Sequence, residues 1–132
     1  MTLINQSFSC VTWNVHRCIG NDKVVDPERT MRVLKQEVWQ PDFAALVLTE
    51  ADACGVPYAQ LLDVARIEAM TGLRSVHTDA AHRWSDESAG FLGNLVFVDP
   101  ACEIASVVAL DLPGLAHRGA VVVEAAHAGI VF

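Results

Sequence analysis

A short apolar run lies between a turn signal and a carboxylate in the stretch Pro41-Asp42-Phe43-Ala44-Ala45-Leu46-Val47-Leu48-Thr49-Glu50. The run from Phe43 to Leu48 is too short for a typical helix, and it follows a proline and an aspartate, which favours a strand buried on both faces. A strand of this kind is typical of a sheet that other layers cover. Thr49 and Glu50 follow directly at the C-terminal end of this strand.

Upstream of this run, the sequence predicts a strand and then a helix. Residues from Phe8 to Val15 alternate between apolar and polar side chains and are rich in strand formers. Asp26 then predicts a helix N-cap, with Pro27 at the first helical position. An apolar stripe follows at helical spacing from Met31 to Val38, and we expect the helix to end near Gln40, before the next proline.

Downstream of the run, we expect a second helix from Pro57 to Thr71, with Gly72 as its C-cap. Short strand-like runs separated by proline and glycine make up most of the remainder. These runs are Leu73–His77, Phe91–Val98, Ile104–Leu110, Ala120–Ala125 and Gly129–Phe132. The order of elements therefore predicts an α/β fold in a single domain, residues 1–132.

Composition limits the classes of protein that the chain could be. Its 132 residues are 52% apolar with a mean hydropathy of +0.32, which excludes a disordered chain and predicts apolar surface left over after folding. The apolar runs are well under the roughly 20 residues of a membrane span, so we expect none. The net charge of −7 mildly disfavours nucleic acid as a partner, because a long polyanion is repelled.

The cysteines and the start of the chain bear on location. Four cysteines are widely spaced with no Cys-x-x-Cys pair, which indicates free thiols in a reducing compartment. The stretch from Met1 to Cys10 has neither a basic segment nor a continuous apolar one, so no signal peptide is expected. Together these observations predict a cytoplasmic protein.

Polar side chains follow two of the predicted strands, in Thr12-Trp13-Asn14-Val15-His16 and Leu48-Thr49-Glu50-Ala51-Asp52. Strand ends in α/β sheets line the crevice where ligands bind. A carboxylate such as Glu50, held by a rigid strand, suits a hard divalent cation, and Asn14 adds an amide oxygen and an NH₂ donor. Asp52 would contribute if its side chain turned inward. The alternative is that Asn14 is a turn residue and Glu50 a surface carboxylate.

The order of these segments resembles the opening of the endonuclease/exonuclease/phosphatase superfamily. In that family an Asn ends the first strand, and the second motif is usually Gln-Glu, whose Glu is a ligand of catalytic Mg²⁺; here Thr49 replaces the Gln. Two later segments are similar to the family's Gly-Asn and Arg-Gly-Ala strands, namely Gly90-Phe91-Leu92-Gly93-Asn94-Leu95-Val96-Phe97 and His117-Arg118-Gly119-Ala120-Val121-Val122. The resemblance implies Mg²⁺ or Mn²⁺ at Glu50 and Asn14, with Asn14, Asn94 and Arg118 as catalytic residues facing phosphate.

The resemblance covers only the first half of the family domain. The motifs that would supply a phosphate-binding His, the Asp and Asn around the attacking water, and an Asp-His base do not follow. We therefore expect an incomplete domain, half of a four-layer α/β sandwich, in which one sheet has helices on one face and an inner face that needs a partner. Two outcomes are expected as alternatives: the chain self-associates through that face, sheet against sheet, or it is a truncated piece of a longer protein that supplies the second half.

The function that the resemblance implies is Mg²⁺-dependent phosphoester hydrolysis, by a phosphodiesterase, nuclease or phosphatase, weak or absent in this chain alone. The alternative is a non-catalytic, self-associating α/β module derived from the same fold. The substrate stays open, because related proteins act on nucleic acids, inositol phosphates and phospholipids.

Overall fold

The computed structural model describes residues 7–127 and 129–132, so most of the stretch in which no signal peptide is expected lies outside the described residues. The strands are β1 (Cys10–Asn14), β2 (Ala45–Thr49), β3 (Arg74–Ser75), β4 (Leu95–Val98), β5 (Glu103–Leu112), β6 (Arg118–His127) and β7 (Ile130–Val131). The helices are α1 (Pro27–Val33) and α2 (Val64–Thr71), with the helical turns η1 (His16–Cys18), η2 (Leu34–Val38) and η3 (Ala80–His82).

The first helix begins as predicted. The Asp26 side chain accepts a hydrogen bond from the backbone N–H of Arg29 at 3.1 Å, and Pro27 occupies the first turn. The helix continues into the wider turn η2, which ends before Trp39. The N-cap and the approximate end of this helix are therefore confirmed.

The second helix starts seven residues later than predicted. Asp63 caps it, accepting from the backbone N–H of Arg66 at 3.2 Å, and Gly72 ends it with a φ of +74° as expected. The segment before Asp63 is irregular because tertiary contacts take up its backbone groups. The Ser88 hydroxyl donates to the carbonyl of Tyr58 at 2.7 Å, and the N–H of Gln60 donates to Glu87 at 2.7 Å.

The strands form two sheets. The first has the order β1-β2-β4-β3, with β1 and β2 parallel and the other pairs antiparallel. The second has the order β5-β6-β7 and is antiparallel throughout. Strand β4 begins four residues later than predicted, because Phe91 and Asn94 exchange backbone hydrogen bonds of 3.0 Å across a tight turn.

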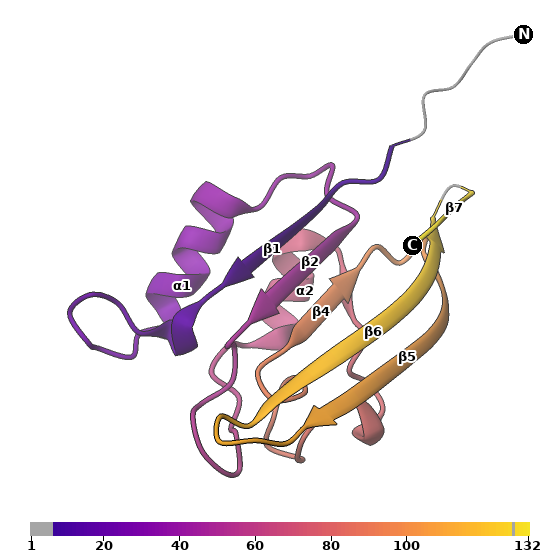
Figure 1. The fold of residues 1–132 in the computed structure, drawn as a ribbon. Helices are drawn as coiled ribbons and strands as arrows, with labels where there is room; N and C mark the ends of the chain where they lie inside the picture. Colours follow the sequence, from indigo (N-terminus) through magenta and orange to yellow (C-terminus); the bar gives the residue numbers. More distant parts are fainter. Residues whose placement is uncertain (1–6, 128) are drawn as a thin grey trace, which may run out of the picture.

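The layers stack as helices, first sheet, second sheet (Figure 1). Side chains on one face of the first sheet pack against α1 and α2 and are completely buried: Leu46, Leu48, Leu95 and Phe97. On the opposite face, Val96 and Val98 of β4 pack against Val107 of β5 and against Val121 and Val123 of β6. The predicted α/β fold is thus confirmed, with two sheets.

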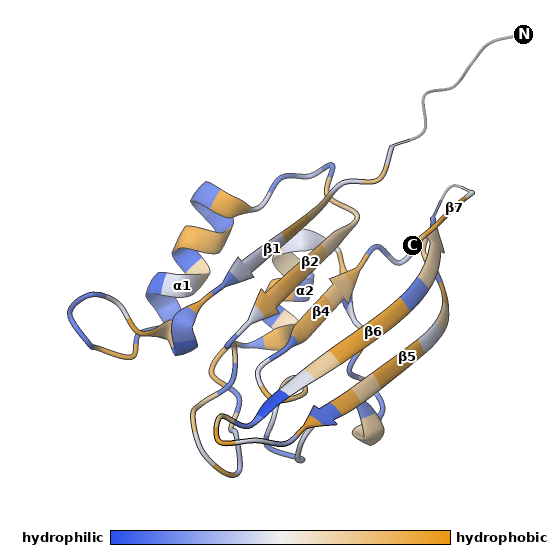
Figure 2. Cartoon of the chain, viewed as in Figure 1, coloured by the Kyte–Doolittle hydropathy of each residue, from blue (hydrophilic) through white to orange (hydrophobic). Residues whose placement is uncertain are grey.

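The position of the uncovered surface differs from the expectation. The chain covers the inner face of β2 and β4 with its own second sheet, because the strands after Pro100 form a separate sheet that packs against the first. Along β1 the inner face stays open, and Cys10, Thr12 and Asn14 are exposed there. Hydrophobic residues also line β5 and β6, and no other element of the described residues covers their outer face (Figure 2). No helix among residues 7–127 and 129–132 is long and apolar enough to cross a membrane.

Candidate functional site

Strands β1 and β2 end side by side and bring two of the predicted residues to one edge of the sheet. The parallel register pairs Asn14 with Thr49, the residue before Glu50. Beyond the strands, the N–H of Val15 donates to the carbonyl of Thr49 at 3.0 Å, and that of Arg17 to the carbonyl of Glu50 at 2.8 Å. Both strand exits therefore lie at the same edge of the first sheet.

A cleft of about 270 Å³ opens at this edge. It is lined by Asn14, Thr49, Glu50, Leu92, Asn94, Arg118 and Gly119. These residues come from the ends of β1 and β2, the turn before β4 and the start of β6. All four residues that the sequence singled out line the same cleft, although they belong to two different sheets.

The cleft contains one close pair of opposite charges. Arg118 Nη1 lies 3.7 Å from Glu50 Oε1, and the two side chains are 55% and 24% exposed. At this distance and exposure the ion pair contributes little to stability. The Arg118 guanidinium can therefore turn toward an anion in the cleft at small cost, and its planar fork suits phosphate.

The two amide side chains of the cleft have different surroundings. Asn94 Nδ2 donates to the carbonyl of Gly119 at 2.8 Å and to that of Phe91 at 3.2 Å, which occupies both of its hydrogens. As folded, Asn94 therefore holds the start of β6 beside the turn that precedes β4. Asn14 Oδ1 accepts from the N–H of His16 at 2.8 Å, while the exposed Asn14 NH₂ makes no hydrogen bond within the described part of the chain.

Two turns with left-handed backbone meet under the cleft. Glu50 has a φ of +51°, Leu92 +48° and Gly93 +84°. The N–H of Ala51 donates to the carbonyl of Gly93 at 2.9 Å, which fastens one turn to the other. Non-glycine residues with positive φ are uncommon and cluster where surrounding structure enforces them, often at ligand sites. This conformation aims the Glu50 side chain, and no sequence signal predicted it.

Two neighbouring residues lie outside the cleft. Asp52 is 1% exposed, and its carboxylate oxygens each accept a backbone N–H at 3.1 Å, from Ala89 and Gly90. Burial raises the pKa of this carboxyl group above its ordinary value. Asp52 is therefore an internal anchor for the turn before β4. His16 is exposed, and its ring Nδ1 lies 3.2 Å from the carbonyl of Ile19.

The oxygen atoms of the cleft form a small set of metal donors. No cluster of three or more His, Cys, Asp or Glu side chains exists within the described ranges. Glu50 supplies one carboxylate, and Asn14 supplies an amide oxygen that already accepts one hydrogen bond. Mg²⁺ commonly takes one or two carboxylates and completes its shell with water and phosphate oxygens. The residues present therefore fit Mg²⁺, with one carboxylate and one amide oxygen from the protein and the other ligands from water and phosphate.

Comparisons with known proteins gave no relative: no family model matches the chain, and neither the curated proteins nor the solved structures gave a match. The function is therefore inferred from the residues and geometry of the cleft.

Proposed function

We propose that this chain carries the metal-binding and phosphate-binding part of a Mg²⁺-dependent phosphoester hydrolase site, of the endonuclease/exonuclease/phosphatase type. One observation carries the proposal. Asn14, Glu50, Asn94 and Arg118 are far apart in sequence, yet all four line one cleft of about 270 Å³. A carboxylate, an amide and a guanidinium in one cleft match the chemistry of a cation and a phosphate bound together.

Each side chain has a separate role in this proposal. Glu50 holds Mg²⁺ or Mn²⁺, with the Asn14 oxygen beside it. The bound cation would neutralise charge on the phosphoryl group. Arg118 turns from Glu50 toward the phosphoryl oxygens, and Asn14 donates its free NH₂ to the same group. Asn94 acts through Gly119, because its hydrogen bond to that carbonyl places the adjacent Arg118.

A general base is the missing part of this arrangement. Within residues 7–127 and 129–132, no His and no carboxylate other than Glu50 lines the cleft. Hydrolysis needs a group that takes the proton from the attacking water. We therefore expect weak or no turnover from these 132 residues alone. The substrate class is a phosphate monoester or a short phosphodiester, since the charge of −7 disfavours a long polyanion.

Metal titration tests the assignment of Glu50 directly. Millimolar Mg²⁺ or Mn²⁺ is expected to raise the melting temperature by a few degrees, because a cation that binds only the folded state stabilises it. Glu50→Gln is expected to abolish the rise, whereas Glu124→Gln on the exposed side of β6 leaves it intact. Hydrolysis of bis(4-nitrophenyl) phosphate is the parallel assay. Turnover that survives Glu50→Gln would contradict the metal assignment.

A second candidate function is a non-catalytic, self-associating module. The observation that favours it is the outer face of β5 and β6, where four large apolar side chains are 44–50% exposed. They are Val108, Leu110, Leu112 and Val122. A second copy of the chain, packed sheet against sheet, would remove them from water.

Light scattering separates the two candidates when it is combined with the metal titration. A dimer at micromolar concentration that Leu110→Glu converts to monomer, with no effect of Mg²⁺ on melting, supports the module. A monomer at that concentration rules out self-association through this face. Val24→Glu, at an exposed position before α1 that is away from both the cleft and the outer face, is the matched control.

A further inference from the structure

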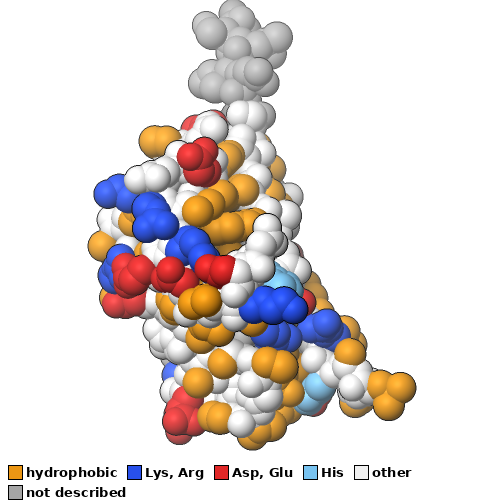
Figure 3. Space-filling view, turned by 90° about the vertical axis from the view of Figure 1, so that its left-hand side faces the viewer, with side chains coloured by type: hydrophobic (Ala, Val, Ile, Leu, Met, Phe, Trp, Pro, Cys, Tyr) orange, Lys and Arg blue, Asp and Glu red, His pale blue; other side chains and the backbone are white. Residues whose placement is uncertain are grey.

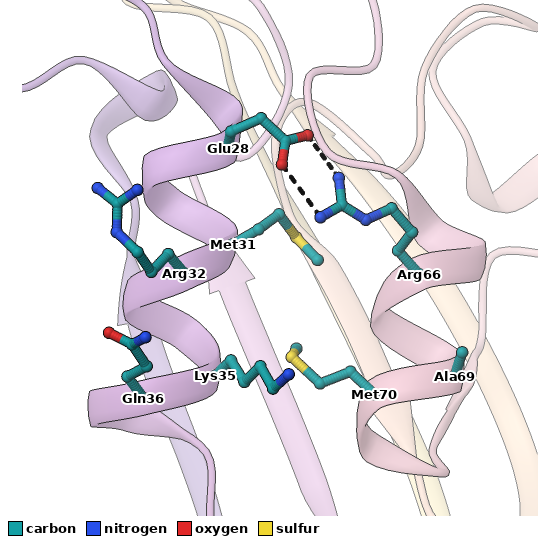
Figure 4. A pocket seen from close by; sticks show the side chains of 8 residues that line it. All are labelled: Glu28, Met31, Arg32, Lys35, Gln36, Arg66, Ala69 and Met70. Atoms are coloured by element: carbon teal, nitrogen blue, oxygen red, sulfur yellow. Dashed lines mark hydrogen bonds and ion pairs between the residues drawn. The ribbon is translucent and has the colours of Figure 1, made fainter.

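The two helices cover the same face of the first sheet but leave a groove between them. Its volume is about 760 Å³, and residues of α1, η2 and α2 line it (Figure 4). At one end the groove is closed by a two-pronged ion pair between Glu28 of α1 and Arg66 of α2, with N to O distances of 2.5 and 3.1 Å. The groove shares no lining residue with the cleft that contains Glu50 and Arg118, so the two are separate features.

Methionine side chains form the apolar part of this groove. Met31 is 6% exposed at its floor, and Met70 is half-buried on the opposite helix. Both thioethers point into the space between the helices (Figure 4). Methionine is flexible and polarisable, so a surface made of it adapts to apolar side chains of different shapes.

The walls of the groove are basic on a protein that is acidic overall. Arg32 and Lys35 of the first helix are exposed and make no ion pair with any described residue. With Arg66 and Glu28 counted, the groove carries a net charge of +2, against −7 for the chain. On the side of the molecule that carries α1, Lys and Arg side chains lie next to hydrophobic ones and beside a row of Asp and Glu side chains (Figure 3).

We propose that this groove binds an acidic amphipathic helix of a partner protein. Apolar side chains one turn apart on that helix would contact Met31 and Met70, and flanking carboxylates would pair with Arg32 and Lys35. A helix fits better than a small molecule because the walls are exposed along their length, whereas small-molecule sites enclose most of the ligand surface. A third helix packing along the groove of two others is a common mode of peptide recognition.

The methionines provide a direct test of this proposal. The chain has three of them, Met1, Met31 and Met70, and two lie in the groove. The probe is a synthetic 14-residue amphipathic helix with leucines at i, i+3, i+4 and i+7 and glutamates on both flanks. The ¹³C-methyl signals of Met31 and Met70 are expected to shift saturably on titration with this peptide, while that of Met1 stays in place.

Charge reversal supplies the matched controls. The double variant Arg32→Glu/Lys35→Glu is expected to weaken binding at least about tenfold, because two attractive pairs become repulsive. Lys23→Glu/Arg74→Glu makes the same change in net charge at exposed positions outside the groove and should leave the affinity unchanged. A second peptide with lysine in place of every glutamate should not bind.

Four results would overturn the proposal. The first is that the methionine signals show no saturable shift up to millimolar peptide, and the second is that the acidic and basic peptides bind equally well. The third is that Arg32→Glu/Lys35→Glu leaves the affinity for the peptide unchanged. The fourth is that vesicles of phosphatidylserine and phosphatidylcholine, added in place of the peptide, shift the signals of Met31 and Met70. The last result would identify the groove as a membrane-binding surface.

Discussion

The side-chain amide of Asn94 donates a hydrogen bond of 2.8 Å to the backbone carbonyl of Gly119. Asn94 immediately precedes β4 in the first sheet, and Gly119 lies near the start of β6 in the second, so this bond joins the two sheets beside the cleft. The neighbouring residue, Arg118, is the cleft's only cation among the residues that line it. One amide from the turn before β4 thus holds the backbone next to Arg118.

Replacing Asn94 with alanine is expected to lower the free energy of unfolding by about 1–3 kcal/mol, because two side-chain hydrogen bonds are lost and the Gly119 carbonyl is left without its donor. Urea denaturation measures this change. Asn21→Ala, in an exposed turn, is the control and should change stability by less than about 0.5 kcal/mol. Equal stability of the two variants would show that the amide does not hold the sheets together.

Gly93→Ala tests the contact between the two left-handed turns. A Cβ at this position would lie 3.2 Å from Glu50 Cα, and the φ of +84° is strained for alanine. We expect a loss of about 2–3 kcal/mol, of which about 1–2 kcal/mol is conformational. Weaker Mg²⁺ stabilisation should accompany it, because Glu50 must shift.

Gly72→Ala is the matched control for that substitution. Its φ is +74°, but nothing lies within 4 Å of the added Cβ, so it carries the conformational cost alone. Urea denaturation of both variants separates the two effects. If Gly93→Ala lowers the free energy of unfolding no more than Gly72→Ala does, the contact between the added Cβ and the backbone of Glu50 has no measurable cost.

His77 is expected to make stability depend on pH. The side chain is 4% exposed; its Nδ1 lies 2.6 Å from the carbonyl of His82, and its Nε2 accepts the N–H of Val96 at 3.0 Å. Both contacts suit the neutral ring, and burial holds the pKa of His77 below its ordinary value of 6.5. As the pH falls through about 6.5, His77 binds a proton in the unfolded chain but stays neutral in the folded chain. The free energy of unfolding therefore decreases below that pH.

Urea denaturation between pH 8 and pH 5 checks this dependence. His77→Gln should lose less stability on acidification than the unmodified chain, since the residue that causes the dependence is gone. His16→Gln removes an exposed imidazole instead and should behave like the unmodified chain. The same acid-induced loss in all three proteins would exclude His77 as its source.

Asp52→Ala is expected to destabilise the fold by about 2–4 kcal/mol, because the buried N–H groups of Ala89 and Gly90 lose their acceptor. Asp42→Ala, in an exposed turn, is the control and should have little effect. Circular dichroism during thermal unfolding measures both. A loss below about 0.5 kcal/mol for Asp52→Ala would mean that water satisfies the two amides equally well.

Much of the cleft could be predicted from short-range patterns. The strand exits at Asn14 and Glu50 follow from the apolar runs before them, and parallel neighbours bring such exits together. The predicted role of Asn94 as a phosphate donor remains a prediction, but its two hydrogen bonds to carbonyls show a structural role that a Gly-Asn pair does not indicate. The local pattern did not predict the burial of Asp52 either, since the two backbone N–H groups that donate to its carboxylate lie 37 and 38 residues away in the sequence.

The sequence by itself determined the α/β class, the order of the elements, the N-cap at Asp26 and the C-cap at Gly72. These features depend on residues within one or two turns of each other. Only the tertiary structure decided where α2 begins, which face stays uncovered, how Glu50 is aimed and that a basic groove separates the helices. Each of these depends on contacts between segments distant in sequence, whose free energies arise only when the sheets and helices pack together.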